Sequence, residues 1–212
     1  MAEIKSDARR TESWTGRAAF SERVMAAMAR VPRHKFVAED DVPFAYLNRP
    51  LPIGHGQTIS QPYIVALMTD LLDLGDSDRV LEIGTGCGYQ TALLADVAGH
   101  VYSIEVKRQL AVAARTRLQR LCYDNVEVRT GQGRDGWPEE APFQAIMVTA
   151  ASEDIPGPLI KQLDRGGRMI IPLCRQIPPQ NLVLIQKDAT GKITKTPVLP
   201  VAFVPLVRGS ES

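Results

Sequence analysis

The sequence predicts an α/β fold: a doubly wound, mostly parallel sheet with an antiparallel C-terminal edge and a short N-terminal helical extension. Two observations carry this prediction. From residue 63 onward, short apolar strands alternate with helical segments, and a glycine-rich turn joins the first strand directly to a helix. Parallel strands need right-handed crossovers, which place helices on both faces of the sheet. In such doubly wound sheets ligands bind at the carboxyl ends of the strands, and we expect the ligand crevice there.

The N-terminal part of the chain carries only one clear helical pattern. Residues 1–16 are polar and lack useful periodicity, so we expect a loose polar arm. Residues 17–30 are predicted to form a small helix that Pro32 terminates. Residues 40–61 are rich in Pro, Gly and polar side chains, which predicts a long irregular loop; ordered loops of such length are usually functional.

The rest of the chain supplies the sheet and its covering helices. Apolar periodicity predicts helices over residues 63–72, 89–97 and 107–121, and strands over residues 79–83, 100–105, 126–130, 145–149, 168–172 and 182–186. A turn at Gly191 precedes an antiparallel edge over 194–204, where Pro197 and Pro200 argue against a central position. We therefore expect a single domain over 17–207, made of a helix and loop (17–62) and an α/β core (63–207), with a tail at 208–212.

Composition and charge argue against several classes of protein. Twenty-five Lys and Arg residues against 24 Asp and Glu give a net charge of +1, so no general attraction to nucleic acid or anionic membranes is expected. The N-terminus lacks an apolar signal segment, and no apolar run is long enough to span a bilayer. Cys87, Cys122 and Cys174 form no C-x-x-C pair, so we expect no metal site and a reducing, cytoplasmic location.

The strongest motif is the glycine turn after the strand at 79–83. Gly84, Gly86 and Gly88 follow the strand at alternate positions and lead into a helix. Glycine allows positive φ and lets a ligand lie against bare backbone. A dinucleotide site would require G-x-G-x-x-G, but Tyr89 occupies the position of its third glycine. On this motif alone, a strand–helix turn without a ligand remains an alternative.

Glu105 ends the next predicted strand, about twenty residues beyond the first glycine, where such folds place a ribose-binding acid. A carboxylate there can accept charge-assisted hydrogen bonds from two vicinal hydroxyls. Alternatively, Glu105 caps the following helix, whose N-terminus favours an acid. The combination with the glycine turn favours the ribose role.

These residues resemble the cofactor motifs of class I S-adenosylmethionine-dependent methyltransferases, which have a Rossmann-like fold. The resemblance implies that the glycine turn lines the cofactor, that Glu82 orders the turn, and that Glu105 binds ribose. The family's G-D-G motif after the third strand is replaced here by Gly131-Gln132-Gly133. In the family, the aspartate of this motif faces the adenine amine. Gln132 can still accept a hydrogen bond there, but it lacks the charge of the aspartate.

A second resemblance concerns the sequence P-L-P-I-G-H-G-Q-T-I-S-Q-P at residues 50–62. It is similar to the signature of protein-L-isoaspartate O-methyltransferases, and matches to that family extend over nearly all of residues 23–207. The resemblance implies Ser60 as the residue tied to activity. It further implies a cofactor site formed by Gln57, Thr58, Ile59, Glu82, Gly84, Thr85, Gly86, Tyr89, Glu105, Val106, Gln132 and Gly133.

Ser60 also has a purely structural interpretation. It precedes a predicted helix that has Pro62 in its first turn, which would make Ser60 an ordinary N-cap that contributes about 1 kcal/mol. The two roles are compatible, because a helix N-terminus with an available hydroxyl suits a carboxylate.

The resemblance implies that a methyl group passes from S-adenosyl-L-methionine to the free carboxylate of isoaspartyl residues, which starts the repair of age-damaged proteins. Isoaspartyl-containing peptides and proteins are the implied substrates, and S-adenosyl-L-homocysteine is the product of the cofactor. The edge at 203–207 is expected to pair with an extended peptide. Three alternatives remain: a methyltransferase acting on a small molecule or RNA, a non-catalytic cofactor-binding module, and a nicotinamide oxidoreductase. The residues indicate no oligomeric state.

Overall fold

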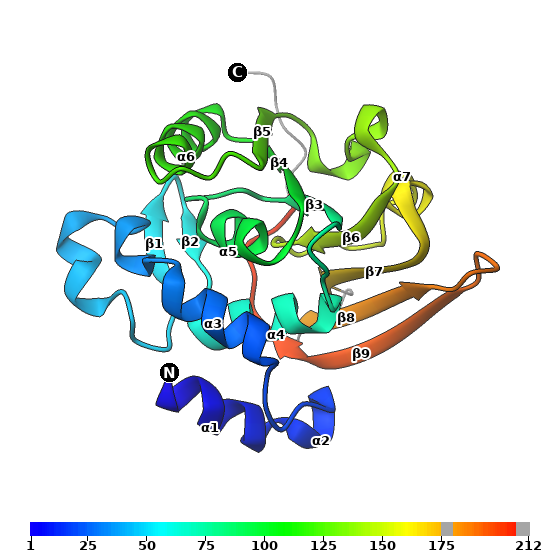
Figure 1. The fold of residues 1–212 in the computed structure, drawn as a ribbon, viewed down its shortest axis with the longest axis horizontal. Coiled ribbons are helices and arrows are strands. Elements are labelled where there is room, and N and C mark those ends of the chain that lie inside the picture. The colour runs from blue at the N-terminus through cyan, green and yellow to red at the C-terminus, as the bar shows by residue number, and fades with distance from the viewer. Residues whose placement is uncertain (175–179, 207–212) are drawn as a thin grey trace.

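A central sheet organises the computed structural model, which describes residues 1–174 and 180–206 (Figure 1). Within these residues the sheet has seven strands in the order β5-β4-β3-β6-β7-β8-β9. The strands from β5 to β7 are parallel, and β8 and β9 add an antiparallel edge. The doubly wound fold with its antiparallel C-terminal edge is therefore confirmed. The strands are β3 (Arg79–Ile83), β4 (His100–Glu105), β5 (Val126–Thr130), β6 (Phe143–Val148), β7 (Leu163–Leu173), β8 (Gln180–Lys187) and β9 (Ile193–Val201).

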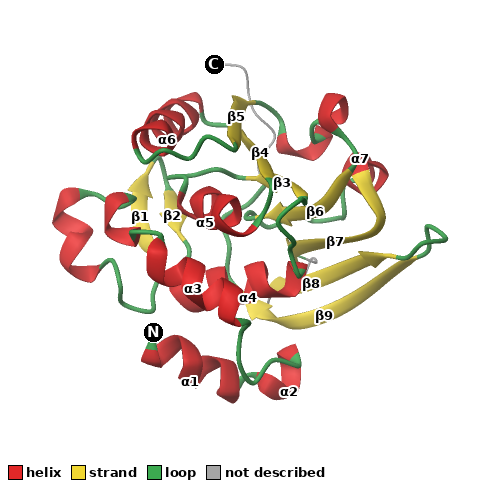
Figure 2. Cartoon of the chain, in the orientation of Figure 1, coloured by secondary structure: helices red, strands yellow, loops and turns green. Residues whose placement is uncertain are grey.

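Helices cover both faces of the sheet because its central strands are apolar on both sides (Figure 2). Along β3, Val80 belongs to one core cluster, whereas Leu81 and Ile83 belong to the other. Residues of α4, α5 and α6 pack in the first cluster, and α7 contributes Leu159 to the second. The helices are α1 (Ala2–Arg10), α2 (Glu12–Thr15), α3 (Glu22–Arg30), α4 (Pro62–Leu72), α5 (Tyr89–Val97), α6 (Arg108–Arg120) and α7 (Gly157–Gln162).

The expectation of a loose arm at 1–16 is wrong, because α1 and α2 occupy most of it and α1 packs against α4 (Figure 1). Ile4 and Ala8 are buried there, four residues apart on one side of α1. The Thr11 and Tyr63 hydroxyls are hydrogen-bonded at 2.5 Å, which ties the arm to the first turn of α4. Only two apolar positions form this stripe, so its periodicity is too short to detect in the sequence.

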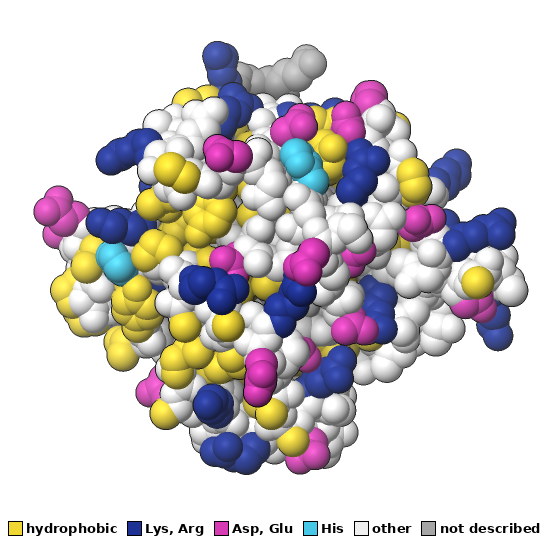
Figure 3. All heavy atoms as spheres, in the orientation of Figure 1, with side chains coloured by type: hydrophobic (Ala, Val, Ile, Leu, Met, Phe, Trp, Pro, Cys, Tyr) yellow, Lys and Arg dark blue, Asp and Glu magenta, His cyan; other side chains and the backbone are white. Residues whose placement is uncertain are grey.

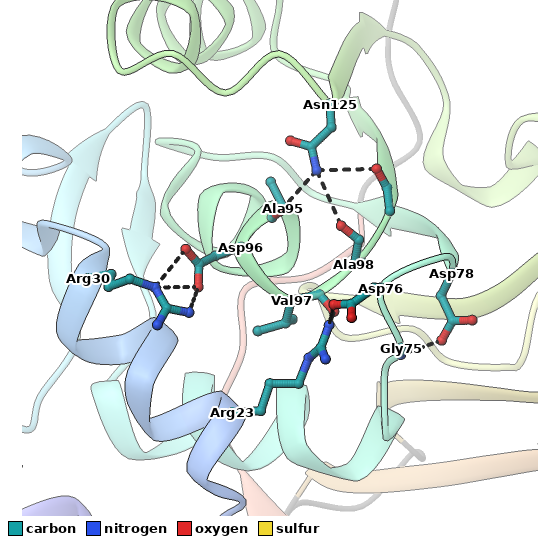
Figure 4. Close-up of polar contacts among 11 residues, drawn as sticks. Arg23, Arg30, Gly75, Asp76, Asp78, Ala95, Asp96, Val97, Ala98 and Asn125 are labelled. Atoms are coloured by element: carbon teal, nitrogen blue, oxygen red, sulfur yellow. Dashed lines mark hydrogen bonds and ion pairs between the residues drawn. The ribbon is translucent and has the colours of Figure 1, made fainter.

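Helix α3 begins at Glu22, five residues later than predicted, because Ser21 caps it by accepting a hydrogen bond from Val24 N at 3.3 Å. Two arginines of α3 reach the neighbouring elements (Figure 4). Arg30 pairs with Asp96 of α5 at 2.5 Å, and Arg23 pairs with Asp76 in the loop before β3. These contacts dock α3 beside α5 at the surface of the first core cluster.

The segment at 40–61 is not the irregular loop that its composition predicts. It contains a 3-10 helix, η2 (Glu39–Phe44), and a hairpin of β1 (Leu51–Gly54) and β2 (Gln57–Ile59). His55 and Gly56 form the turn of this hairpin with φ of 52° and 69°. Positive φ at both central positions is typical of tight hairpin turns, but His-Gly is a weaker sequence signal for such turns than Asn-Gly or Asp-Gly.

The C-terminal strand β9 lies at the edge of the sheet and carries Pro197 and Pro200, in agreement with the predicted placement. Val207 and the predicted tail at 208–212 lie outside the described residues. No helix within residues 1–174 and 180–206 has both the length and the apolar character that crossing a membrane requires. On the face shown in Figure 3, basic and acidic side chains are interspersed.

Candidate cofactor and substrate site

The site lies where the strand order of the sheet reverses. After β3 the chain builds β4 and β5 on one side, and it then returns to place β6 on the other side of β3. Ligands of open α/β sheets bind at such a point, outside the carboxyl ends of the strands. Here the ends of three adjacent strands bring together the glycine turn after β3, Glu105 at the end of β4 and Thr149 after β6.

Two glycines of the turn are required both by their positive φ and by the lack of space for a Cβ atom. Gly84 has φ of 99°, and a Cβ there would lie 2.3 Å from Thr149 Oγ1, which itself donates a hydrogen bond to the Gly84 carbonyl at 2.7 Å. Gly88 has φ of 88°, and a Cβ there would press on Leu118 of α6 at 3.3 Å. A side chain at either position would therefore push Thr149 or α6 away from the turn.

Glu105 connects the glycine turn with the start of α6. Its side chain is buried, with one oxygen accepting from Gly86 N at 2.9 Å and the other from Lys107 N at 2.9 Å. Lys107 is the N-cap residue of α6, so the helix-start interpretation of Glu105 is partly right. Each carboxylate oxygen has a further lone pair, so both remain able to accept a hydroxyl of a ligand.

Glu82 lies beneath the turn and is fully buried. Its Oε2 accepts hydrogen bonds from Thr91 of α5 at 2.5 Å and from Ser103 of β4 at 2.6 Å. Because the Ser103 proton is used there, Thr85 donates to Ser103 at 2.6 Å, which links the turn to Glu82. Oε1 has no hydrogen-bond partner among the described residues. Burial, opposed by these two hydroxyls and reinforced by the charge of Glu105, raises the pKa of Glu82 to about 8.

Replacing Glu82 by glutamine is expected to remove a pH dependence of stability. The folded-state pKa of about 8 exceeds the ordinary 4.5, so the folded protein keeps a proton that the unfolded chain releases. The stabilising contribution of this group is full below pH 4.5 and is lost as the pH rises to 8, by up to about 1.4 kcal/mol per pH unit. Urea unfolding should therefore show a flatter pH profile for Glu82→Gln than for the wild type. Parallel profiles would contradict the buried, protonated state, and the exposed Glu127→Gln serves as control.

A narrow cavity of about 70 Å³ opens along the glycine turn. It adjoins a larger cavity of about 400 Å³, and the two share Thr58, Thr149 and Val204 in their walls. Ser60 lines the larger cavity. Of the residues that the sequence assigned to a cofactor, the narrow cavity is lined by Gln57, Thr58, Gly84, Gly86, Glu105, Val106 and Gly133.

Five residues assigned to the cofactor do not line this cavity. Ile59 is buried in the core, and Glu82 and Thr85 lie beneath the turn. Tyr89 points into the core, where its ring packs against Phe36 and its hydroxyl donates to Met28 Sδ at 3.7 Å. Gln132 is exposed beside Gly133, at the start of a 3-10 helix. These five side chains therefore lie outside the wall of the narrow cavity.

Sequence reasoning missed one wall of the cavity, which is formed by Thr149, Ala150 and residues 204–206. Thr149 was detectable, because it is the last residue of a predicted strand, and ligands bind at the carboxyl ends of parallel strands. The pairing of residues 203–207 with a peptide stays a prediction, and one side of this segment is already engaged within the protein. Ala151 N donates to Val204 O at 2.8 Å and Leu206 N donates to Ala151 O at 2.7 Å, so this backbone is already paired within the protein.

The structure bears on the capping interpretation of Ser60. The N-cap of α4 is Gln61, whose side chain makes no capping hydrogen bond. Ser60 therefore is not the N-cap that its position before Pro62 suggests. Its place in the wall of the larger cavity remains, two residues before the first residue of an eleven-residue helix.

A Rossmann-like sheet with a glycine turn after its first parallel strand and a buried acid at the end of the second is the arrangement that S-adenosylmethionine-dependent methyltransferases share with dinucleotide-binding proteins, and similarity to known proteins decides between these two classes. The family model described as protein-L-isoaspartate(D-aspartate) O-methyltransferase matches residues 12–211. A protein-L-isoaspartate O-methyltransferase 2 of Polaromonas sp. is 56% identical over 206 residues, covering 97% of this chain and 98% of the relative. Its counterpart in Syntrophobacter fumaroxidans is 58% identical over 209 residues, covering 99% and 85%. This chain belongs to the protein-L-isoaspartate(D-aspartate) O-methyltransferase family.

Solved structures agree with this assignment. A protein-L-isoaspartate O-methyltransferase superposes with a TM-score of 0.83 at 26% identity, covering 96% of this chain and 65% of the other. A Plasmodium falciparum structure described as a protein-L-isoaspartate O-methyltransferase in complex with S-adenosyl-L-homocysteine gives 0.78 at 25% identity, with 97% of both chains covered.

Proposed function

We propose that this protein transfers the methyl group of S-adenosyl-L-methionine to the free carboxylate of isoaspartyl residues in damaged proteins, the first step of their repair. The observation that carries the proposal is the pair of adjoining cavities. One is lined by the glycine turn and Glu105, the other by Ser60, and Thr58, Thr149 and Val204 stand between them. A donor held in the first and an acceptor held in the second would meet at this shared wall.

The residues of the narrow cavity fit the cofactor. Glu105 can accept from the two ribose hydroxyls, and bare backbone at Gly84 and Gly86 allows close approach of the amino-acid part. Val106 and Gly133 lie on the side where the adenine would rest, with Gln132 next to it. Gln57 and Thr58 of β2 would cover the methionine end. When bound, the cofactor supplies a methyl group on a sulfonium cation.

The chemistry of the acceptor explains why no base is needed. An isoaspartyl residue exposes an α-carboxyl group with a pKa of about 3.5, so the group is an anion at neutral pH. A carboxylate oxygen forms the new bond to the methyl carbon as the carbon–sulfur bond breaks and its electron pair stays on sulfur. The protein must then align the reacting atoms and exclude water, and such orientation can supply about 7–11 kcal/mol.

In this proposal, Ser60 orients the substrate rather than deprotonating it. Its hydroxyl can donate one hydrogen bond to the carboxylate. The N-terminal end of α4 lies next to it, and the dipole of this helix favours a negative charge there. Together these groups would hold the anion at the wall shared with the cofactor cavity.

A pair of peptides tests the proposed function. One contains a single isoaspartyl residue and the other contains normal aspartate in the same sequence. We expect methyl transfer from labelled S-adenosylmethionine to the isoaspartyl peptide alone, with base-labile label as the signature of an ester. A third peptide with D-aspartate measures the second specificity that the family description includes. Equal labelling of the isoaspartyl and aspartyl peptides would refute the proposed substrate.

A further inference from the structure

Arg33 has one of the largest fully buried side chains among the described residues, with 1% of its surface exposed. It belongs to a short 3-10 helix, η1 (Arg33–Lys35), which connects α3 to the segment before the hairpin. Arginine is almost never buried to this degree unless its charged group has partners. The position of this side chain therefore calls for an explanation from its contacts.

The guanidinium of Arg33 joins three segments of the chain. Nε donates to the Ala45 carbonyl at 2.7 Å, and Nη2 donates to the Ser60 carbonyl at 2.7 Å. The group lies 4.8 Å from the centroid of the Tyr89 ring, close enough for a cation–π contact. Nη1 is buried and has no hydrogen-bond partner among the described residues. Both bonded acceptors are thus backbone carbonyls, and one of them belongs to Ser60 itself.

The Ser60 carbonyl lies in the short link between β2 and α4. The local sequence offers this link little support, because Pro62 has no N–H and the side chain of the N-cap residue Gln61 makes no capping hydrogen bond. On the helix side of the link, the Asn48 side chain accepts a hydrogen bond from Tyr63 N at 2.9 Å and thereby fixes the first turn of α4. Arg33 fixes the other side of the same link. The orientation of the peptide group after Ser60 therefore depends on the hydrogen bond from the buried Arg33 guanidinium.

We infer that Arg33 is a positioning residue, which holds the Ser60 carbonyl and so fixes the direction of the Ser60 hydroxyl in the substrate cavity. This inference rests on the proposed role of Ser60. The planar guanidinium reaches Ala45 and Ser60 at once, whereas a lysine ammonium would act as a single flexible point donor. Arg33 itself lies outside the walls of the substrate and cofactor cavities.

Arg33→Lys is expected to lower kcat for an isoaspartyl peptide by about 10- to 100-fold, because a displacement of about 1 Å at a reacting group can have an effect of this size. The affinity for S-adenosylhomocysteine, measured by calorimetry, should change by less than about threefold. Arg168→Met is a matched control: this arginine donates to the Leu71 carbonyl at the opposite end of α4 and pairs with Asp73. The control should retain kcat even if its melting temperature falls.

A double-mutant cycle distinguishes action through Ser60 from general support of the fold. If Arg33 acts through Ser60, adding Arg33→Lys to Ser60→Ala should lower kcat by less than about threefold. Losses that multiply, an unchanged kcat in Arg33→Lys, or a lysine variant that loses cofactor affinity would each overturn the inference. Full turnover by Ser60→Ala would instead contradict the proposed role of Ser60, and the inference about Arg33 would fail with it.

Discussion

Ser60→Ala is expected to lower kcat for the isoaspartyl peptide by about 100-fold or more, because the carboxylate loses an oriented donor next to the reacting carbon. Cofactor affinity should stay within about threefold, since the Ser60 side chain lines the larger cavity rather than the narrow one. Steady-state kinetics and calorimetry with S-adenosylhomocysteine measure the two quantities separately.

Ser21→Ala is the matched control for this experiment. Ser21 is a true N-cap, so its replacement should lower the free energy of unfolding by about 1 kcal/mol and leave kcat intact. Ser60 caps no helix in the described structure, so the two variants should show opposite patterns. A fall in melting temperature with normal turnover in Ser60→Ala would restore the capping interpretation and remove the catalytic one.

Glu105→Ala is expected to weaken S-adenosylhomocysteine binding by about 100-fold or more. In the proposed role, Glu105 accepts two charge-assisted hydrogen bonds from the ribose, each worth about 1.5–3 kcal/mol, and the alanine variant would lose both. The Gly86 and Lys107 amides also lose their acceptor, which loosens the turn and the start of α6. Glu105→Gln keeps an oxygen acceptor and should fall between the wild type and the alanine variant.

Glu127→Ala provides the comparison on the neighbouring strand. Its side chain is 55% exposed on β5, and its ion-pair partner is His100 at 3.4 Å, away from the glycine turn. Calorimetry should show wild-type affinity for this variant. If Glu105→Ala bound S-adenosylhomocysteine as tightly as Glu127→Ala does, the assignment of the ribose to Glu105 would be untenable.

The strands at 79–83, 100–105 and 126–130 and the helix at 89–97 agree with the sequence prediction residue for residue. Each has apolar residues at the spacing typical of its element, so local pattern suffices to place it. The helix at 157–162 was missed because only six residues form it between Pro156 and the long strand β7. Pattern recognition needs more than one turn of helix to detect a period.

The cofactor motif was readable for the same reason. Glycines after a strand and an acid after the next strand are local signals, and parallel topology places them at one edge of the sheet. The sequence did not indicate that Tyr89 would turn into the core, because its direction depends on Phe36 and Met28, more than fifty residues earlier in the chain.

By itself, the sequence determined the α/β class and the succession of strands and helices along the central part of the chain. It also determined the glycine turn and the acid beside it, and the family resemblance indicated the reaction. Tertiary structure alone decided that the N-terminal residues fold onto α4, that residues 204–206 close one wall of the cofactor cavity, and that Arg33 holds the Ser60 carbonyl. These features join segments far apart in the chain. Local periodicity reports which face of an element is apolar, but it does not report which distant segment will cover that face.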